Sequence, residues 1–186
     1  MIVVLVACGA ACSEPPDPRR TNFRVERDNV KAQYDEKTGR MKRLEVDTDK
    51  NGKTDTWTFM DGTRIDRIEI DRDEDGKIER WEYYVDNKLE KVGSSRRGDG
   101  VVDEWAFQGP TGVVARVETD LDRDGRIDKW ERFDPPLTPG AAPTLREVAL
   151  DPDASGKPAT RLFYNARGEF ERVEKIGGAT PPAPRP

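Results

Sequence analysis

Two acidic segments, residues 71–82 and residues 120–131, have nearly the same sequence and limit the possible fold more than any other feature of the chain. In both, carboxylates stand at positions one, three and five and a glycine at position six: Asp71, Asp73, Asp75 and Gly76, then Asp120, Asp122, Asp124 and Gly125. Carboxylates at alternate positions converge when the chain bends, and glycine allows a bend that a side chain would block. The segments therefore predict loops that gather oxygen ligands around a calcium ion.

The spacing of both segments resembles the calcium loop of EF-hand proteins, and also the loops of dockerins and thrombospondin type 3 repeats. The EF-hand loop takes ligands from positions one, three, five, seven, nine and twelve, and position seven contributes its backbone carbonyl. The resemblance implies that Ca2+ is held by Asp71, Asp73, Asp75, Lys77, Glu79 and Glu82 in one loop and by Asp120, Asp122, Asp124, Arg126, Asp128 and Glu131 in the other.

The last carboxylate of each loop depends on the structure that follows it. A helical turn would bring Glu82 and Glu131 back to the ion, whereas a strand would carry each of them about 10 Å beyond position nine. Lys77 and Arg126 could contribute backbone carbonyls alone. The three aspartates that open each loop are the ligands that do not depend on this choice.

Three further segments are degenerate copies of the loop. The copy at residues 47–58 has lost the last carboxylate, and its candidate ligands are Asp47, Asp49, Asn51 and Asp55. The copy at residues 95–106 has Ser95 and Arg97 at positions one and three, and an arginine there would repel a cation. The copy that starts at residue 151 keeps only the opening of the loop. We expect two calcium sites, with the loop at residue 47 as a third candidate.

Strand patterns alternate with the loops at a regular interval. Trp57, Trp81, Trp105 and Trp130 recur every 24 or 25 residues, each just behind an acidic loop. Segments of alternating apolar and charged residues flank the loops, and turn signals such as Asp61-Gly62 close each unit. The pattern predicts an all-β fold: an antiparallel β-meander of about 24-residue hairpin repeats, with acidic loops along one edge and tight turns along the other.

A helical alternative competes with this prediction. An interval of 24 residues is too short for the two helices of an EF-hand, because an average helix alone has about 11 residues. A dockerin-like module needs a single helix after each loop and does fit, with Ile127, Trp130 and Phe133 at a helical interval. The alternating segments favour strands, so the dockerin-like module is the alternative.

The turn and strand halves of the repeat, such as residues 81–92, resemble MORN-like and YD-type β-hairpin repeats of bacterial surface proteins. Together with the loops, the chain resembles bacterial lipoproteins built from DxDxDG loops that are each followed by a tryptophan strand. No activity carries over from this resemblance. The leading prediction is a lipid-anchored, calcium-binding β-repeat protein of the bacterial cell envelope with a structural or binding role. A MORN-like immunity protein that recognises a partner is the alternative, and a carbohydrate-active protein a remote one. The tryptophans would stack laterally on the sheet or form a carbohydrate-stacking ladder.

The N-terminus carries a targeting pattern. Residues 1–7 are almost wholly apolar, and Leu5-Val6-Ala7-Cys8 resembles the lipobox of bacterial lipoproteins. The resemblance implies a signal segment over residues 1–8, lipidation of Cys8, and a lipid-anchored location at the bacterial outer membrane or in the periplasm. A chance apolar N-terminus with ordinary or disulfide-bonded cysteines is the alternative. We then expect a polar, proline-rich tether over residues 9–28, the β-repeat domain over residues 29–176 and a disordered tail over residues 177–186.

Composition excludes several classes of function. The 186-residue chain has no histidine and only two cysteines, both within the first dozen residues, which excludes Ser-His-Asp and Cys-His catalysis and histidine-ligated metals. Charged residues make up 37% of the chain, and the net charge of −5 with interspersed basic residues gives no sign of a nucleic-acid partner. A thin sheet offers no deep pocket, so we expect no enzymatic activity, while a protein or glycan partner stays open.

Overall fold

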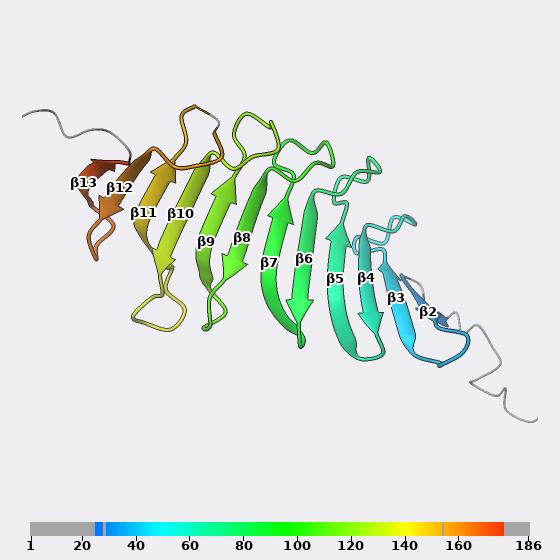
Figure 1. Cartoon of the computed structure of the whole chain (residues 1–186). Helices are drawn as coiled ribbons and strands as arrows, with labels where there is room; N and C mark the ends of the chain where they lie inside the picture. The colour runs from blue at the N-terminus through cyan, green and yellow to red at the C-terminus, as the bar shows by residue number, and fades with distance from the viewer. Residues whose placement is uncertain (1–24, 28, 154, 177–186) are drawn as a thin grey trace, which may run out of the picture.

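The computed structural model describes residues 25–27, 29–153 and 155–176, and this part of the chain is all-β (Figure 1). Thirteen described strands form one sheet in which each strand pairs antiparallel with the next along the chain, so the predicted β-meander is confirmed. The strands are β1 (Val25–Arg27), β2 (Val30–Tyr34), β3 (Met41–Val46), β4 (Thr56–Asp61), β5 (Arg64–Ile70), β6 (Arg80–Val85), β7 (Lys88–Ser94), β8 (Glu104–Gln108), β9 (Val114–Thr119), β10 (Lys129–Asp134), β11 (Thr144–Leu150), β12 (Thr160–Tyr164) and β13 (Phe170–Lys175).

The boundaries of the sheet differ slightly from those expected. β1 lies within the predicted tether over residues 9–28 and pairs with β2, from Val25 opposite Ala32 to Arg27 opposite Val30. Three residues are too few for the alternation of a strand to be recognised in the sequence. Cys8, the signal segment and the C-terminal tail lie outside the described residues and stay predictions. Within the described residues no helix is long and apolar enough to span a membrane.

The sheet is a single layer. Among the described elements, only strands that are neighbours along the chain pack against one another, so no second layer lies on either face. The buried apolar residues of this part of the chain are few: Ala32, Val92 and Ala149. The low apolar content of the sequence therefore corresponds to a fold that has almost no enclosed core.

Strand register sorts the side chains onto two faces. One face, which we call the tryptophan face, carries two rows that run across the strands. The first row reads Lys31, Glu45, Trp57, Glu69, Trp81, Gly93, Trp105, Glu118, Trp130, Ala149, Arg161 and Glu174, and the second reads Gln33, Arg43, Phe59, Arg67, Tyr83, Lys91, Phe107, Arg116, Arg132, Glu147, Phe163 and Arg172. The opposite face is mostly aliphatic, with residues such as Leu44, Ile68, Val92 and Val117.

Ion pairs and cation–π contacts hold the tryptophan face together laterally. On several strands an arginine of the second row pairs with a glutamate of the first, as in Arg67 with Glu69 at 2.7 Å and Arg116 with Glu118 at 3.1 Å. The guanidinium carbon of Arg67 also lies 3.7 Å from the ring centroid of Phe59 on the adjacent strand. Such contacts supply cross-strand packing where no second layer does.

Loops and turns lie on opposite edges of the sheet, as expected (Figure 1). In the turn between β6 and β7, Asp86 and Asn87 have positive φ angles of 49° and 60°, which suit a two-residue hairpin turn. The Asn87 side chain also joins this turn to the preceding one, because its Oδ1 accepts a hydrogen bond from Ile65 N at 2.7 Å. The turn edge is therefore connected from hairpin to hairpin.

The turn between β2 and β3 is closed by Asp35. Its Oδ1 accepts hydrogen bonds from the backbone and the hydroxyl of Thr38, at 2.9 and 3.0 Å, and these lower the pKa of Asp35 to about 2. A lowered pKa contributes stability that is present above the unfolded value of 3.8 and is lost as the pH falls through about 2.

We expect Thr38→Val to raise the pKa of Asp35, measured by NMR titration of the carboxyl carbon. An unchanged pKa would contradict this role of the hydroxyl, and Thr63→Val in the next turn is the control.

Candidate metal sites

Each acidic loop begins at the end of one strand and ends at the start of the next. Glycine occupies position six with a positive φ, 88° at both Gly76 and Gly125, so a side chain there would be strained. The amide of this glycine donates to the carboxylate at position one: Gly76 N to Asp71 Oδ2 at 3.0 Å and Gly125 N to Asp120 Oδ2 at 3.0 Å. The glycine thus folds the loop back onto its first aspartate.

The carboxylate at position nine closes the loop from the other side by accepting a hydrogen bond from the amide at position two. The same bond recurs in four loops, from Thr48 to Asp55 at 2.7 Å, Arg72 to Glu79 at 2.7 Å, Arg96 to Asp103 at 3.1 Å and Leu121 to Asp128 at 2.6 Å. Consecutive loops are also linked, because the amide at position one donates to the position-nine carbonyl of the preceding loop, as in Asp71 N to Asp55 O at 2.9 Å.

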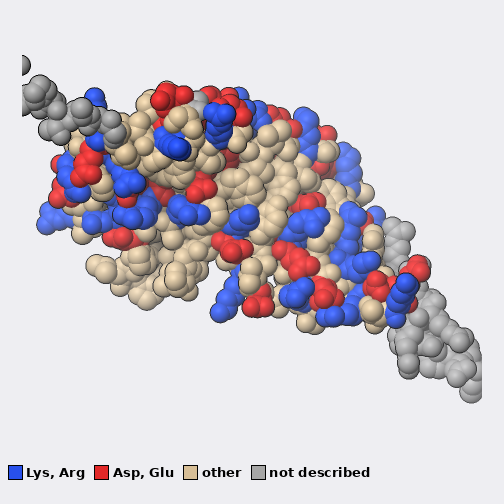
Figure 2. All heavy atoms as spheres, viewed as in Figure 1, with Lys and Arg blue, Asp and Glu red and all other residues tan. Residues whose placement is uncertain are grey.

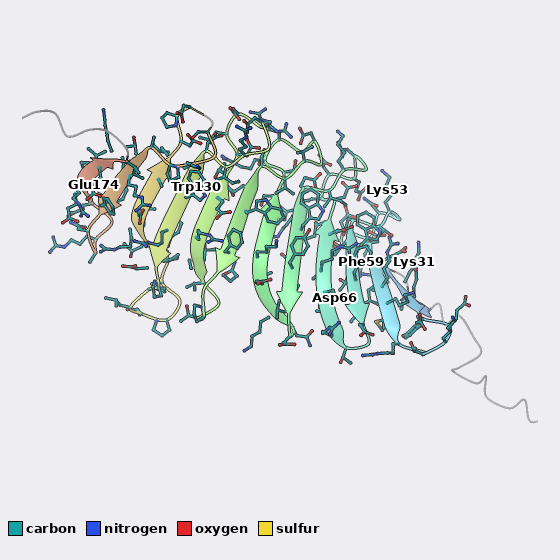
Figure 3. The ribbon with its side chains drawn as sticks, viewed as in Figure 1. Lys31, Lys53, Phe59, Asp66, Trp130 and Glu174 are labelled. Carbon is teal, nitrogen blue, oxygen red and sulfur yellow. The ribbon has the colours of Figure 1, made fainter. Side chains whose placement is uncertain are left out.

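The described loops contain three groups of carboxylates whose oxygens lie within 4.8 Å of one another: Asp71, Asp73, Asp75 and Glu79; Asp47, Asp49 and Asp55; and Asp120, Asp122 and Asp128. Each group could hold a metal ion. All the members were expected as ligands from the sequence. Figure 3 shows the side chains of these loops along one edge of the ribbon, with Lys53 labelled in the first loop.

The group at Asp71 has two buried oxygens without a hydrogen-bond partner. Asp71 is only 4% exposed, and its Oδ1 and the Oε1 of Glu79 are both enclosed and unpaired. Burial raises the pKa of Glu79, and the negative charges of Asp73 and Asp71 raise it further. Buried oxygens normally have hydrogen-bond partners or a cationic side chain beside them, and these two carboxylate oxygens have neither.

Six expected ligands lie outside these groups. Glu82 is in β6, where it pairs with Arg80 Nε at 2.7 Å and accepts a hydrogen bond from Tyr84 Oη at 2.7 Å. Glu131 is in β10 and pairs with Lys129 at 2.9 Å. The expectation that these two glutamates close the loops is corrected, because a strand directly follows each loop and carries them away from position nine.

The other four, Asn51, Lys77, Asp124 and Arg126, lie within their loops. Asp124 Oδ1 accepts a hydrogen bond from Arg126 N at 2.8 Å, and Asn51 Oδ1 accepts one from Lys53 N at 2.9 Å. These side chains stabilise the second half of the loop. For Lys77, whose expected contribution was a backbone carbonyl, the ammonium group pairs with Asp75 at 2.8 Å and lowers the pKa of that carboxyl.

Position four of a loop has a role that the sequence did not reveal. Its residue adopts a positive φ, 59° at Glu74 and 69° at Arg123, and its side chain reaches the preceding loop. Glu74 contacts Asn51 and pairs with Lys53 at 3.3 Å, whereas Arg123 pairs with Asp99 and lowers the pKa of that carboxyl. In the loop that carries Ser95 and Arg97, a guanidinium from the next repeat thus supplies positive charge.

Comparisons with known proteins give little further information. No family model matches the chain, and no curated protein matches it. Among solved structures, it is similar to a TarM mutant of S. aureus in complex with fondaparinux, alpha-GlcNAc-glycerol and UDP, at 15% identity over 61% of this chain, with a TM-score of 0.33. It is also similar to one chain of the crystal structure of accessory secretory protein 1, 2 and 3 in Streptococcus pneumoniae, at 19% identity over 69% of this chain, with a TM-score of 0.31. In both matches the chain spans 20% of the other chain's length.

The expectation that this chain has no enzymatic activity is corrected at this point. The comparisons do not support it, and it is withdrawn. TM-scores of 0.31 to 0.33 are too low to assign a reaction, a substrate or a partner to the chain.

Proposed function

We propose that this protein is a calcium-binding β-repeat protein with a structural or binding role, in which metal ions at the loop edge stabilise a sheet that has almost no core. The pair of enclosed, unpaired oxygens at Asp71 and Glu79 carries the proposal. They lie in a group of four carboxylates whose mutual repulsion a divalent cation would relieve.

The donor set favours calcium over other metals. The groups offer carboxylate oxygens, the ligands that Ca2+ prefers, and the chain has no histidine for a zinc or copper site. Ca2+ binds oxygen at about 2.3–2.6 Å, so two ligands of one ion lie at most about 5 Å apart. The 4.8 Å limit within each group meets this condition. Mg2+ requires shorter and more regular octahedral contacts than flexible loops provide.

The number of carboxylates in each loop gives the expected order of calcium affinity. The loop at Asp71 gathers four and has the unpaired oxygens, while the loops at Asp47 and Asp120 gather three each. The loop at Ser95 already has Arg123 beside Asp99 and should bind no ion. We therefore expect three calcium sites, the strongest at Asp71.

Terbium luminescence tests this order, because Tb3+ substitutes for Ca2+ and is excited through a nearby indole such as Trp81. We expect the full chain to show sensitised emission that calcium displaces. Asp71→Asn should remove a large share of the emission, and Asp99→Asn, the matched control in the arginine-bearing loop, should leave it unchanged. Emission that calcium fails to displace, or equal losses in the two variants, would contradict the proposal.

A further inference from the structure

The tryptophan face is a second candidate surface, separate from the loops. None of the described strands covers it, and Figure 2, which looks onto this face, shows lysine and arginine side chains following one another across the sheet. From β2 to β13 its two rows hold eight cationic and five anionic residues, although the whole chain has a net charge of −5. The face is therefore more positive than the rest of the protein and suits an anionic partner.

The surroundings of the tryptophans differ along the row. Trp57 lies between Glu45 and Glu69, so carboxylates flank it on both sides. Trp81 lies beside Gly93. The ring of Trp105 fills the space over Gly93, since a Cβ added to this glycine would lie 2.9 Å from a ring atom of Trp105. Trp130 has Ala149 on the following strand, which offers only a methyl group.

A hollow of about 350 Å3 lies at this place, within the range of about 300–1,000 Å3 usual for small-molecule sites. Trp130 and Ala149 form its apolar part, and Arg116, Arg132 and Arg161 surround them. All three arginines are exposed. Figure 3 labels Trp130 on β10.

The arginines are only partly neutralised. Arg132 and Arg161 share the carboxylate of Glu147, at 2.8 and 3.4 Å, and Arg116 pairs with Glu118. One carboxylate for two guanidinium groups leaves N–H donors free for an additional anion, and guanidinium groups bind planar oxyanions such as carboxylates in a bidentate manner. An apolar ring beside these donors fits a ligand with one flat apolar surface and one anionic group.

We infer that this hollow binds a sugar unit of an acidic polysaccharide, with a pyranose ring stacked on the indole of Trp130 and its carboxylate or sulfate held by the arginines. The spacing of the row agrees with an extended glycan. Trp105 and Trp130, on β8 and β10, lie about 9.6 Å apart across the sheet, a length comparable to two linked sugar rings. Glu69 and Glu118 stand in the same row and disfavour a densely charged polymer. A nucleic-acid strand fits less well for this reason, because it carries a phosphate at every nucleotide, whereas a polysaccharide such as hyaluronan carries a carboxylate only on every second sugar.

The test measures binding of the full chain to immobilised hyaluronan, dextran sulfate and neutral dextran by biolayer interferometry, in constant calcium. We expect binding to at least one of the two anionic polymers and none to dextran; hyaluronan tests a carboxylate and dextran sulfate a sulfate. Trp130→Ala and Arg161→Gln should each weaken binding about tenfold, the scale of losing one stacking platform or one charge-assisted hydrogen bond.

Two matched variants separate this site from general effects. Trp57→Ala removes a tryptophan of the same row that lies between carboxylates, and Lys129→Gln removes a cation on the strand of Trp130 that belongs to the opposite face. Neither should change the affinity. Lack of binding to both anionic polymers, equal losses in Trp57→Ala and Trp130→Ala, or tighter binding of single-stranded oligothymidine with the same dependence on Trp130 would overturn the inference.

Discussion

Calcium at 1 mM should raise the free energy of unfolding by about 0.4–1.4 kcal/mol per site, for dissociation constants of about 10⁻⁴ to 10⁻³ M. An ion that binds only the folded protein stabilises it, and here it also relieves repulsion among carboxylates within 4.8 Å of one another. Three sites would contribute up to about 4 kcal/mol, and each kcal/mol corresponds to about 2–4 °C in melting temperature for a chain of this size. For a sheet with three buried apolar residues among those described, this is a large effect.

Variants should locate this effect in the loops. Asp71→Asn should lower the melting temperature in calcium and change it little in chelator, because the amide oxygen of asparagine can still accept the hydrogen bond from Gly76 N, whereas the ion loses a charged ligand. Asp99→Asn should lower it equally in both conditions, since it removes the ion pair with Arg123. Differential scanning calorimetry with and without chelator measures both. If Asp71→Asn lost the same stability in the two conditions, the loop at Asp71 would be a plain turn.

Gly93→Ala should cost about 1–3 kcal/mol, the usual effect of adding a group to a packed position. The new Cβ would lie 2.9 and 3.1 Å from two ring atoms of Trp105 and 3.2 Å from Val102 Cγ1, so the indole must move. A fold in which only neighbouring strands pack together has no second layer to compensate for a displaced tryptophan.

A double-mutant cycle measured by urea denaturation isolates this contact. In a Trp105→Ala background the ring is absent, and Gly93→Ala should then cost much less than in the natural chain. Equal costs in the two backgrounds would mean that the penalty comes from the backbone at Gly93.

The strand pattern of the chain was predictable because its causes are local. Alternation fixes which face a side chain occupies, and the acidic loops and hairpin turns mark where strands end, so the meander followed from the sequence. The opening aspartates of the loops gather for the same reason, since Gly76 and Gly125 fold each loop onto its first residue.

The features that were missed depend on contacts between repeats. Glu74 and Arg123 each reach a loop about 24 residues earlier, and this contact exists only after neighbouring hairpins have paired. Glu82 and Glu131 were expected as ligands by analogy with a loop that is followed by a helix. Here β6 and β10 follow instead, and both glutamates pair with cations on the strand. The charge at position four was the signal in the sequence that could have indicated the first of these contacts.

The single-layer arrangement also bears on how such a chain could change in evolution. Because each strand packs only on its neighbours, the stability of the sheet is close to a sum over repeats and the interfaces between them. A mutation in one loop then costs one local contribution and leaves distant repeats intact. The loop with Ser95 and Arg97 fits this picture: its described residues form no group of carboxylates like those of the three candidate sites, Arg123 of the next repeat supplies a charge beside Asp99, and the pairing of β7 with β8 is regular. Duplication of whole repeats would be tolerated for the same reason, which gives the chain freedom to vary in length and in its number of acidic loops.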